Sequence, residues 1–104
     1  MGTDAFAVLA EPTRRRILDA LRRSEQSVGE LVGELRLAQP VVSKHLRVLR
    51  ESGFVTARVA AQQRIYRLEP ARLRAIDAWL EPYRRMWGNH LEALERHLDR
   101  KVRK

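Results

Sequence analysis

Residues 39–53 read QPVVSKHLRVLRESG, and this stretch carries the clearest structural signal in the chain. Its apolar residues recur at steps of four and three, which places them on one face of a helix: Val42, Leu46 and Leu49. Pro40 suits the first turn of that helix, and Gly53 suits the position just after its end. The stretch therefore predicts an amphipathic helix that begins at Pro40 and ends near Gly53.

The face opposite this apolar stripe suits a DNA major groove. Lys44 and Arg47 can meet phosphates or guanine, and Ser43 can contact either. Gln39 stands at the N-terminal end, which recognition helices insert into the groove, and its amide suits adenine. The candidate DNA contacts on this helix are Gln39, Pro40, Val41, Ser43, Lys44 and Arg47. A solvated amphipathic helix would show the same pattern, so this helix alone leaves both interpretations open.

Three shorter helices are predicted before this stretch. The first covers residues 4–9 with Thr3 as its cap, and the second covers residues 11–23. Ser27 and Glu30 form a capping-box pattern, which opens a third helix of about two turns. A short break then separates the third helix from the fourth, so the two form a helix-turn-helix.

A β-hairpin is predicted directly after the fourth helix. Two β-prone runs, residues 54–59 and 64–68, flank a polar turn at residues 60–63. Basic and amide side chains crowd this hairpin: Arg58, Gln62, Gln63, Arg64 and Arg67. They suit a minor groove or flanking phosphates, and they also protect an exposed sheet edge.

The last third of the chain predicts one long helix that joins two copies of the protein. Its apolar residues recur at alternating steps of three and four over about seven turns. Pro82 is expected to kink this helix. One small domain cannot cover so long a stripe, and buried tryptophans are frequent interface anchors, so we predict a homodimer. The predicted interface residues are Phe6, Leu73, Ile76, Trp79, Leu80, Tyr83, Trp87, Leu91, Leu94 and Leu98.

These elements together predict a winged helix-turn-helix domain. The fold class is mainly α with a small β-hairpin, in the order α-α-α-α-β-β-α, and it dimerises through the terminal helices. A single domain is expected over residues 1–104. Its parts are a helix-turn-helix at about 28–52, a wing at about 55–68 and a dimerisation helix at about 71–100.

The composition favours a polyanionic partner and excludes several functions. The 104 residues include 21 Lys and Arg against 13 Asp and Glu, for a net charge of +8, and there is no Cys. The charge suits nucleic acid or an anionic membrane surface, and the missing thiols exclude disulfides and thiolate sites. Neither a membrane span nor a signal peptide is recognisable, so we expect a cytoplasmic protein. No residue pattern assembles a nucleophile or a phosphate loop, so we expect neither enzymatic activity nor a cofactor.

Four segments, in order, resemble the ArsR-type (ArsR/SmtB) winged-helix transcriptional repressors. They are AEPTRRRIL at 10–18, VGEL at 28–31, QPVVSKHLRVLRESGFV at 39–55 and RIYRL at 64–68. The similarity covers about residues 4–80. It implies a homodimer that binds an imperfect inverted repeat in double-stranded DNA as a repressor, often at its own promoter. An effector often releases the DNA in this family, and the sequence does not identify one here.

The resemblance also implies a role for His45 and Arg14. It puts His45 on the DNA side with Gln39, Ser43 and Lys44, whereas the helical wheel puts it nearer the core, where it would bond a neighbouring helix. Arg14 matches a frequent family arginine, which could reach a phosphate or pair with Glu11.

The chain departs from the family pattern in three places. Ala38 stands where a capping Ser or Thr is frequent, and the wing turn lacks its usual glycine, so we expect a wider tip. The third helix lacks the cysteines of the metal-sensing branches. His90 and His97 do not have the ligand spacing of a zinc site, so no bound metal is expected. A winged helix that binds RNA or a protein partner remains the alternative function.

Overall fold

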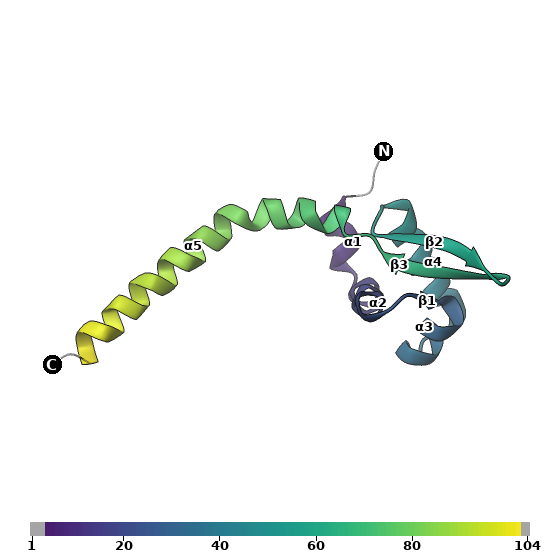
Figure 1. Cartoon of the computed structure of the whole chain (residues 1–104), viewed down its shortest axis with the longest axis horizontal. Coiled ribbons are helices and arrows are strands. Elements are labelled where there is room, and N and C mark those ends of the chain that lie inside the picture. The colour runs from purple at the N-terminus through teal and green to yellow at the C-terminus, as the bar shows by residue number, and fades with distance from the viewer. Residues whose placement is uncertain (1–3, 103–104) are drawn as a thin grey trace. The chain divides into compact units, whose positions relative to one another are not determined.

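The computed structural model describes residues 4–102. Its elements are α1 (Ala5–Ala10), α2 (Pro12–Arg23), β1 (Gln26–Ser27), α3 (Val28–Leu35), α4 (Gln39–Glu51), β2 (Val55–Ala60), β3 (Gln63–Leu68) and α5 (Ala71–Val102). Apart from the short strand β1, this order confirms the predicted mainly α fold with a β-hairpin. The β2–β3 hairpin projects beyond the helices around it as a wing (Figure 1). The chain divides at Arg74 into two compact units, the second of which is the rest of α5.

The core of the first unit takes one apolar face from each helix and from the base of the wing. Its largest fully buried side chains are Phe54, Ile17, Leu31, Leu46, Leu49, Val8, Val42 and Val55. The inner face predicted for α4 is therefore confirmed. Phe54 follows α4 directly, and the guanidinium of Arg72, in the first turn of α5, lies 5.9 Å from its ring centre. This cation–π contact ties the start of α5 to the core.

A three-stranded antiparallel sheet joins the helix-turn-helix to the wing. Its strand order is β1-β3-β2, with Ser27 opposite Ile65 and Gln26 opposite Tyr66. The sequence analysis missed β1. Ser27 is also the cap of α3: its hydroxyl accepts from the Glu30 backbone at 3.2 Å, while the Glu30 carboxylate accepts from the Ser27 backbone at 3.0 Å. The predicted capping box is therefore confirmed, and its first residue also belongs to the sheet.

Two other helix starts differ in how they are capped. Asp4 caps α1, since its carboxylate accepts a hydrogen bond from the Phe6 backbone at 3.1 Å. The sequence analysis gave that role to Thr3, which lies outside the described residues. The first residue before α4 is Ala38, which makes no side-chain cap, as expected. The N-terminus of α4 therefore leaves backbone N–H groups to other partners.

Two turns use the left-handed backbone region without glycine. Arg36, between α3 and α4, has φ 56°, while Ala61 and Gln62, at the tip of the wing, have φ 50° and 70°. Because Ala60 pairs with Gln63, only two residues connect the strands. The expectation of a wide tip was wrong: the register forces a tight turn, and Ala61 and Gln62 adopt the positive φ that glycine or asparagine would normally supply.

The backbone at Arg36 predicts a stabilising substitution. Arg36→Gly should raise the free energy of unfolding by about 0.5–1 kcal/mol. Glycine adopts the left-handed conformation without the clash of a Cβ atom, and this gain exceeds the cost of its greater conformational entropy in the unfolded chain. The side chain is exposed, and within residues 4–102 it makes no hydrogen bond or ion pair that would be lost. Urea unfolding at fixed protein concentration measures the effect. Arg50→Gly, inside α4, is the matched control and should destabilise the protein instead. Equal losses in both variants would contradict the prediction.

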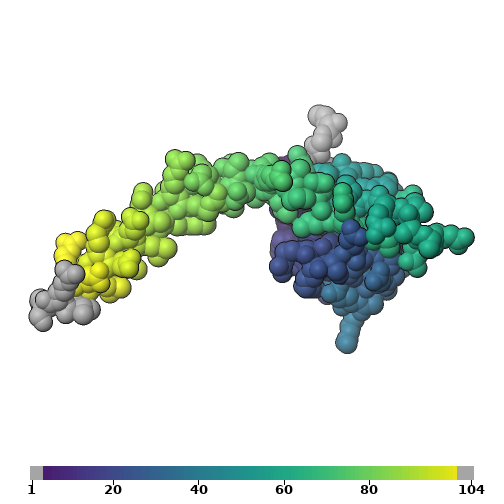
Figure 2. Space-filling view, in the orientation of Figure 1, coloured from purple at the N-terminus to yellow at the C-terminus, as the bar shows by residue number. Residues whose placement is uncertain are grey.

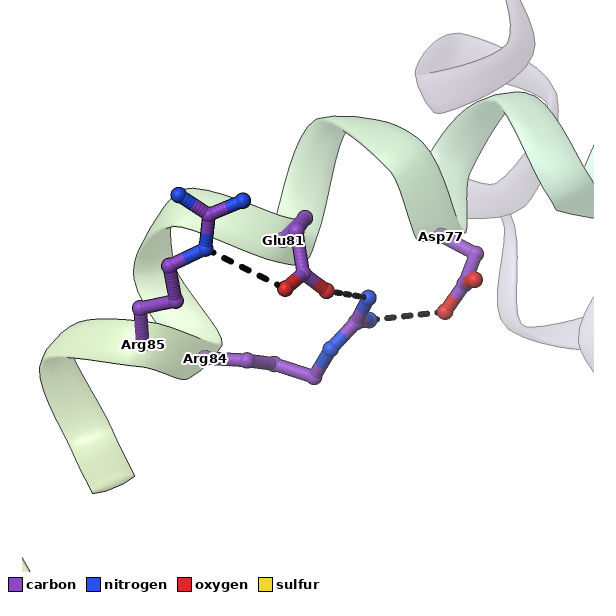
Figure 3. A network of polar contacts seen from close by, with 4 residues as sticks. All are labelled: Asp77, Glu81, Arg84 and Arg85. Atoms are coloured by element: carbon purple, nitrogen blue, oxygen red, sulfur yellow. Dashed lines mark hydrogen bonds and ion pairs between the residues drawn. The ribbon is translucent and has the colours of Figure 1, made fainter.

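Helix α5 continues through Pro82, and charged side chains bridge the turn around it (Figure 3). Proline lacks the N–H that would bond the carbonyl four residues earlier. Across this gap Arg84 donates to Asp77 at 2.7 Å and to Glu81 at 2.6 Å, and Arg85 donates to Glu81 at 3.3 Å. The hydrogen bond from Arg84, and then that from Arg85, lowers the pKa of Glu81. Side-chain contacts thus support the helix where the backbone bond is missing.

Candidate nucleic-acid interface

Helix α4 is held by its inner face and leaves its outer face open. It packs against α2, α3 and β2 through the buried side chains of Val42, Leu46 and Leu49. The candidate DNA contacts predicted on its other side are all exposed: Gln39, Pro40, Val41, Ser43, Lys44 and Arg47. Arg47 is the one of these that forms an ion pair among the described residues, with Glu51 at 3.4 Å. Both side chains of this pair are largely exposed, so the ion pair is weak and Arg47 can exchange Glu51 for a phosphate.

The wing presents a second basic surface. In the β2–β3 ladder Val59 lies opposite Arg64 and Ala60 opposite Gln63, so the cation and the amides gather at the end that projects in Figure 2. Gln62, Gln63 and Arg64 are exposed. These side chains extend from strands whose other ends are fixed in the core by Val55 and Tyr66. The wing tip is therefore a supported protrusion with cationic and amide groups at its end.

Two arginines at the base of the wing already have partners. Arg58 forms an ion pair with Glu25 at 2.9 Å, and Arg67 donates to the Thr56 hydroxyl at 3.1 Å. Arg58 and Ile65 are opposite each other in the ladder, as are Thr56 and Arg67. The sequence analysis placed Arg58 among the DNA contacts, and to act as one it would have to leave Glu25, which comes from the segment before β1.

Arg14 and His45 lie together inside the first unit. Arg14 Nε donates to the Val8 carbonyl at 2.8 Å, and Arg14 Nη1 lies 3.4 Å from His45 Nδ1. Among the described residues, the hydrogen bonds of Arg14 go to α1 and α4 and not to Glu11, one of the two partners that the sequence analysis offered. Arg14 instead reaches the carbonyl end of α1, because the last carbonyls of a helix have no partner within it. His45 is half-buried on the side of α4 nearest the core, where the helical wheel puts it.

Comparison with known proteins identifies the family. The model of the bacterial regulatory proteins of the arsR family matches residues 11–57. The HTH-type transcriptional regulator Rv2034 of Mycobacterium tuberculosis is 36% identical over 95 residues, which cover 91% of this chain and 86% of that protein. The chain belongs to the ArsR family. The matched residues run from the cap of α2 through α3 and α4 to β2, and they include the whole outer face of α4.

Other ArsR-family relatives are named as repressors. The Biofilm growth-associated repressor of Agrobacterium fabrum is 45% identical over 67% of this chain and 61% of its own length. The HTH-type transcriptional repressor SmtB of M. tuberculosis is 41% identical over 62% of this chain, and this chain spans about half of SmtB, 48%. ArsR-family proteins are transcriptional regulators, so this chain belongs to a class of DNA-binding regulators and not to a class of enzymes.

Solved ArsR-family structures share the fold. The ArsR family transcriptional regulator RHA00566 has a TM-score of 0.70 and 32% identity, over 81% of this chain and 92% of that one. The transcriptional repressor BigR from Xylella fastidiosa has a TM-score of 0.63 and 34% identity, over 79% of this chain and 82% of that one. The fold is therefore the winged helix-turn-helix of this family.

The second unit of this ArsR-family chain exposes an apolar stripe. Trp79, Trp87, Leu91, Leu94 and Leu98 are each 48–62% exposed, and Tyr83, 43% exposed, stacks on Trp79 with ring centres 4.8 Å apart. Met86, three residues after Tyr83, is also 65% exposed, and the sequence analysis did not name it. Of the other predicted interface residues, Phe6 is 45% exposed, Ile76 and Leu80 are half-buried, and Leu73 lines a pocket of about 280 Å³ with Leu9, Leu18 and Leu68.

The described residues offer neither a metal-binding cluster nor a membrane-spanning helix. Within residues 4–102, no three His, Asp or Glu side chains come close enough together to hold a metal ion. In the same residues, no helix is both long enough and apolar enough to span a membrane.

Proposed function

We propose that this ArsR-family regulator is a cytoplasmic homodimeric repressor that binds an inverted repeat in double-stranded DNA, including a repeat at its own promoter. In each protomer, the outer face of α4 would enter the major groove. The wing tip would lie on the adjacent minor groove or its phosphates. The homodimer is what would set the spacing of the two half-sites.

The observation that carries this proposal is the division of α4 into two faces. Its inner face is buried against three other elements, so the helix is held rigidly. Its outer face combines an amide, a hydroxyl and two cations and is exposed from its first residue onward. A rigid helix with exposed hydrogen-bonding side chains near its N-terminus can read base edges.

The proposed dimer rests on the second unit. The exposed stripe of α5 carries large aromatic and leucine side chains, which single soluble protomers rarely leave in contact with water as one continuous strip. A two-fold axis that pairs this stripe with itself would give the DNA-binding surface the symmetry of an inverted repeat.

Substitutions in α4 and in the wing should separate sequence reading from anchoring. Gln39→Ala should weaken binding to the selected duplex more than to a scrambled one, by about 1–3 kcal/mol, because a bidentate amide–adenine contact depends on the base. Arg64→Ala should weaken binding to both duplexes about equally, because a phosphate contact is indifferent to sequence. Each variant is titrated on the duplex that the wild-type protein selects from a random library and on its scrambled form, at two salt concentrations.

The control is the salt slope. Arg64→Ala should reduce it by about one contact, whereas Gln39→Ala should leave it unchanged. An equal loss on both duplexes for Gln39→Ala would contradict the proposed orientation of α4 and move the reading of sequence to the wing or the first turn of α2.

A further inference from the structure

We propose that Arg14 and His45 form a positioning link that fixes the recognition helix α4 to helix α1, and that neither residue contacts DNA. This inference rests on the proposed function, since it concerns how α4 is held for reading DNA. It reassigns His45, which the family resemblance places on the DNA side, and Arg14, for which the resemblance allows either a phosphate or Glu11 as partner.

The first observation is how α1 ends. The last four carbonyls of this helix, those of residues 7–10, lack partners within the helix. Arg14 donates to the carbonyls of Ala7 at 3.5 Å and Val8 at 2.8 Å, and the next residue, Arg15, donates to those of Leu9 at 2.6 Å and Ala10 at 3.1 Å. Two neighbouring arginines at the start of α2 therefore cap the whole carbonyl end of α1.

The second observation is that only Arg14 extends this cap to α4. Its Nη1 lies 3.4 Å from His45 Nδ1, and a guanidinium can only donate, so the imidazole nitrogen accepts. One planar group thus bonds α1 with its Nε side and α4 with its Nη1 side. Lysine could not bridge both partners, because its ammonium is a single point at the end of a flexible chain.

The electrostatics around His45 agree with an acceptor role. Burial and then the charge of Arg14 lower the pKa of His45 from its ordinary value of 6.5, Lys44 lowers it further, and Glu11 opposes them. Arg14 and Glu11 come from α2 and its cap, and Lys44 comes from α4 itself. At neutral pH the imidazole is therefore uncharged. A proton on Nδ1 would replace the hydrogen bond with two facing cations, so the link is lost as the pH falls through the lowered pKa.

The two roles of His45 predict opposite responses to acid. If His45 meets a phosphate, its protonation adds a cation at the DNA and strengthens binding. If it accepts from Arg14, protonation releases α4 and weakens binding to the selected duplex. The informative quantity is the ratio of the dissociation constants of wild type and His45→Asn, because the amide oxygen of Asn can accept from Arg14 but does not titrate near neutral pH. The other histidines and the net charge act on both proteins and cancel.

The experiment measures this ratio on the selected and scrambled duplexes between about pH 8 and pH 5.5. The expected result is a rise of about three- to tenfold in the wild-type to Asn ratio at low pH, on the selected duplex only. If the wild-type to Asn ratio of dissociation constants decreases as the pH is lowered, His45 contacts a phosphate. If the ratio stays constant, protonation of His45 has no role in binding. Either result overturns the proposal.

Substitutions of the two arginines provide a second test. Arg14→Lys keeps the charge but should lower affinity for the selected duplex by about tenfold, whereas Arg15→Lys, which weakens the cap of α1 alone, should not. Circular dichroism checks that both variants fold. Nitrogen NMR of the histidine rings in the free wild-type protein should show His45 protonated on Nε2 only.

If the wild type fails to distinguish the two duplexes, the proposed function fails. If it distinguishes them and Arg14→Lys matches Arg15→Lys, only the link fails.

Discussion

Leu91→Asp is expected to convert the protein to a monomer and to lower its affinity for the selected inverted repeat by about 10²–10⁴-fold. Leu91 is 62% exposed in the single chain, in the middle of the apolar stripe of α5. A carboxylate there would have to be desolvated against the partner's stripe, which opposes pairing. A monomer binds one half-site and loses the effective concentration that the linked second half-site supplies.

Asn89→Asp is the matched control for this substitution. It adds the same single negative charge two residues earlier, about 200° around the helix from Leu91, so it should leave the dimer intact. Analytical ultracentrifugation at micromolar concentration gives the assembly state, and titration of the duplex gives the affinity. A wild-type protein that sediments as a monomer would remove the basis of this prediction. So would a Leu91→Asp dimer of undiminished affinity.

The affinity for duplex DNA is expected to fall by about 10³–10⁵-fold between about 50 and 200 mM salt. Each chain carries a net charge of +8, and its exposed cations include Lys44 on α4 and Arg64 on the wing. A dimer that places about 6–10 such groups on phosphates would release a counterion for each. The slope of log affinity against log salt therefore measures how many contacts form.

A competitor distinguishes this result from binding to other polyanions. Transfer RNA added at about 150 mM salt should not displace the selected duplex at equal phosphate concentration. The recognition helix fits the major groove of B-form DNA, whereas the major groove of an RNA helix is too narrow to admit it. A flat salt response would indicate a protein partner, and efficient displacement by transfer RNA would indicate an RNA-binding winged helix.

The elements that the sequence predicted well depend on local chemistry. The inner face of α4 follows from the spacing of Val42, Leu46 and Leu49, and the start of α3 follows from the Ser27–Glu30 capping box. Both patterns act within one or two turns of a helix. A reader of the sequence can therefore place the helix-turn-helix, and with it the exposed candidates on α4, without any knowledge of distant contacts.

The features that the sequence did not predict depend on neighbours distant in the chain. Gln26 and Ser27 are polar, and they form a strand only because β3 offers them Tyr66 and Ile65. The tight wing tip results from the pairing of Ala60 with Gln63, which overrides the preference of Ala61 for negative φ. The hydrogen-bond partners of Arg14 belong to α1 and α4, which its position three residues after Glu11 in the sequence does not indicate.

Ser27 belongs to the sheet that carries the wing and is also the N-cap of α3, which packs against α4. This shared residue has a consequence for DNA recognition. The two elements that would contact the duplex, α4 and the wing, are thus connected through one residue and the helix it caps, so the distance between them is fixed. On the proposed binding mode, a duplex whose neighbouring grooves do not match this distance has to bend or twist to fit, and the ease of that deformation depends on its sequence. The protein would then discriminate among base pairs that no side chain contacts, namely those between the groove that α4 enters and the groove that the wing contacts.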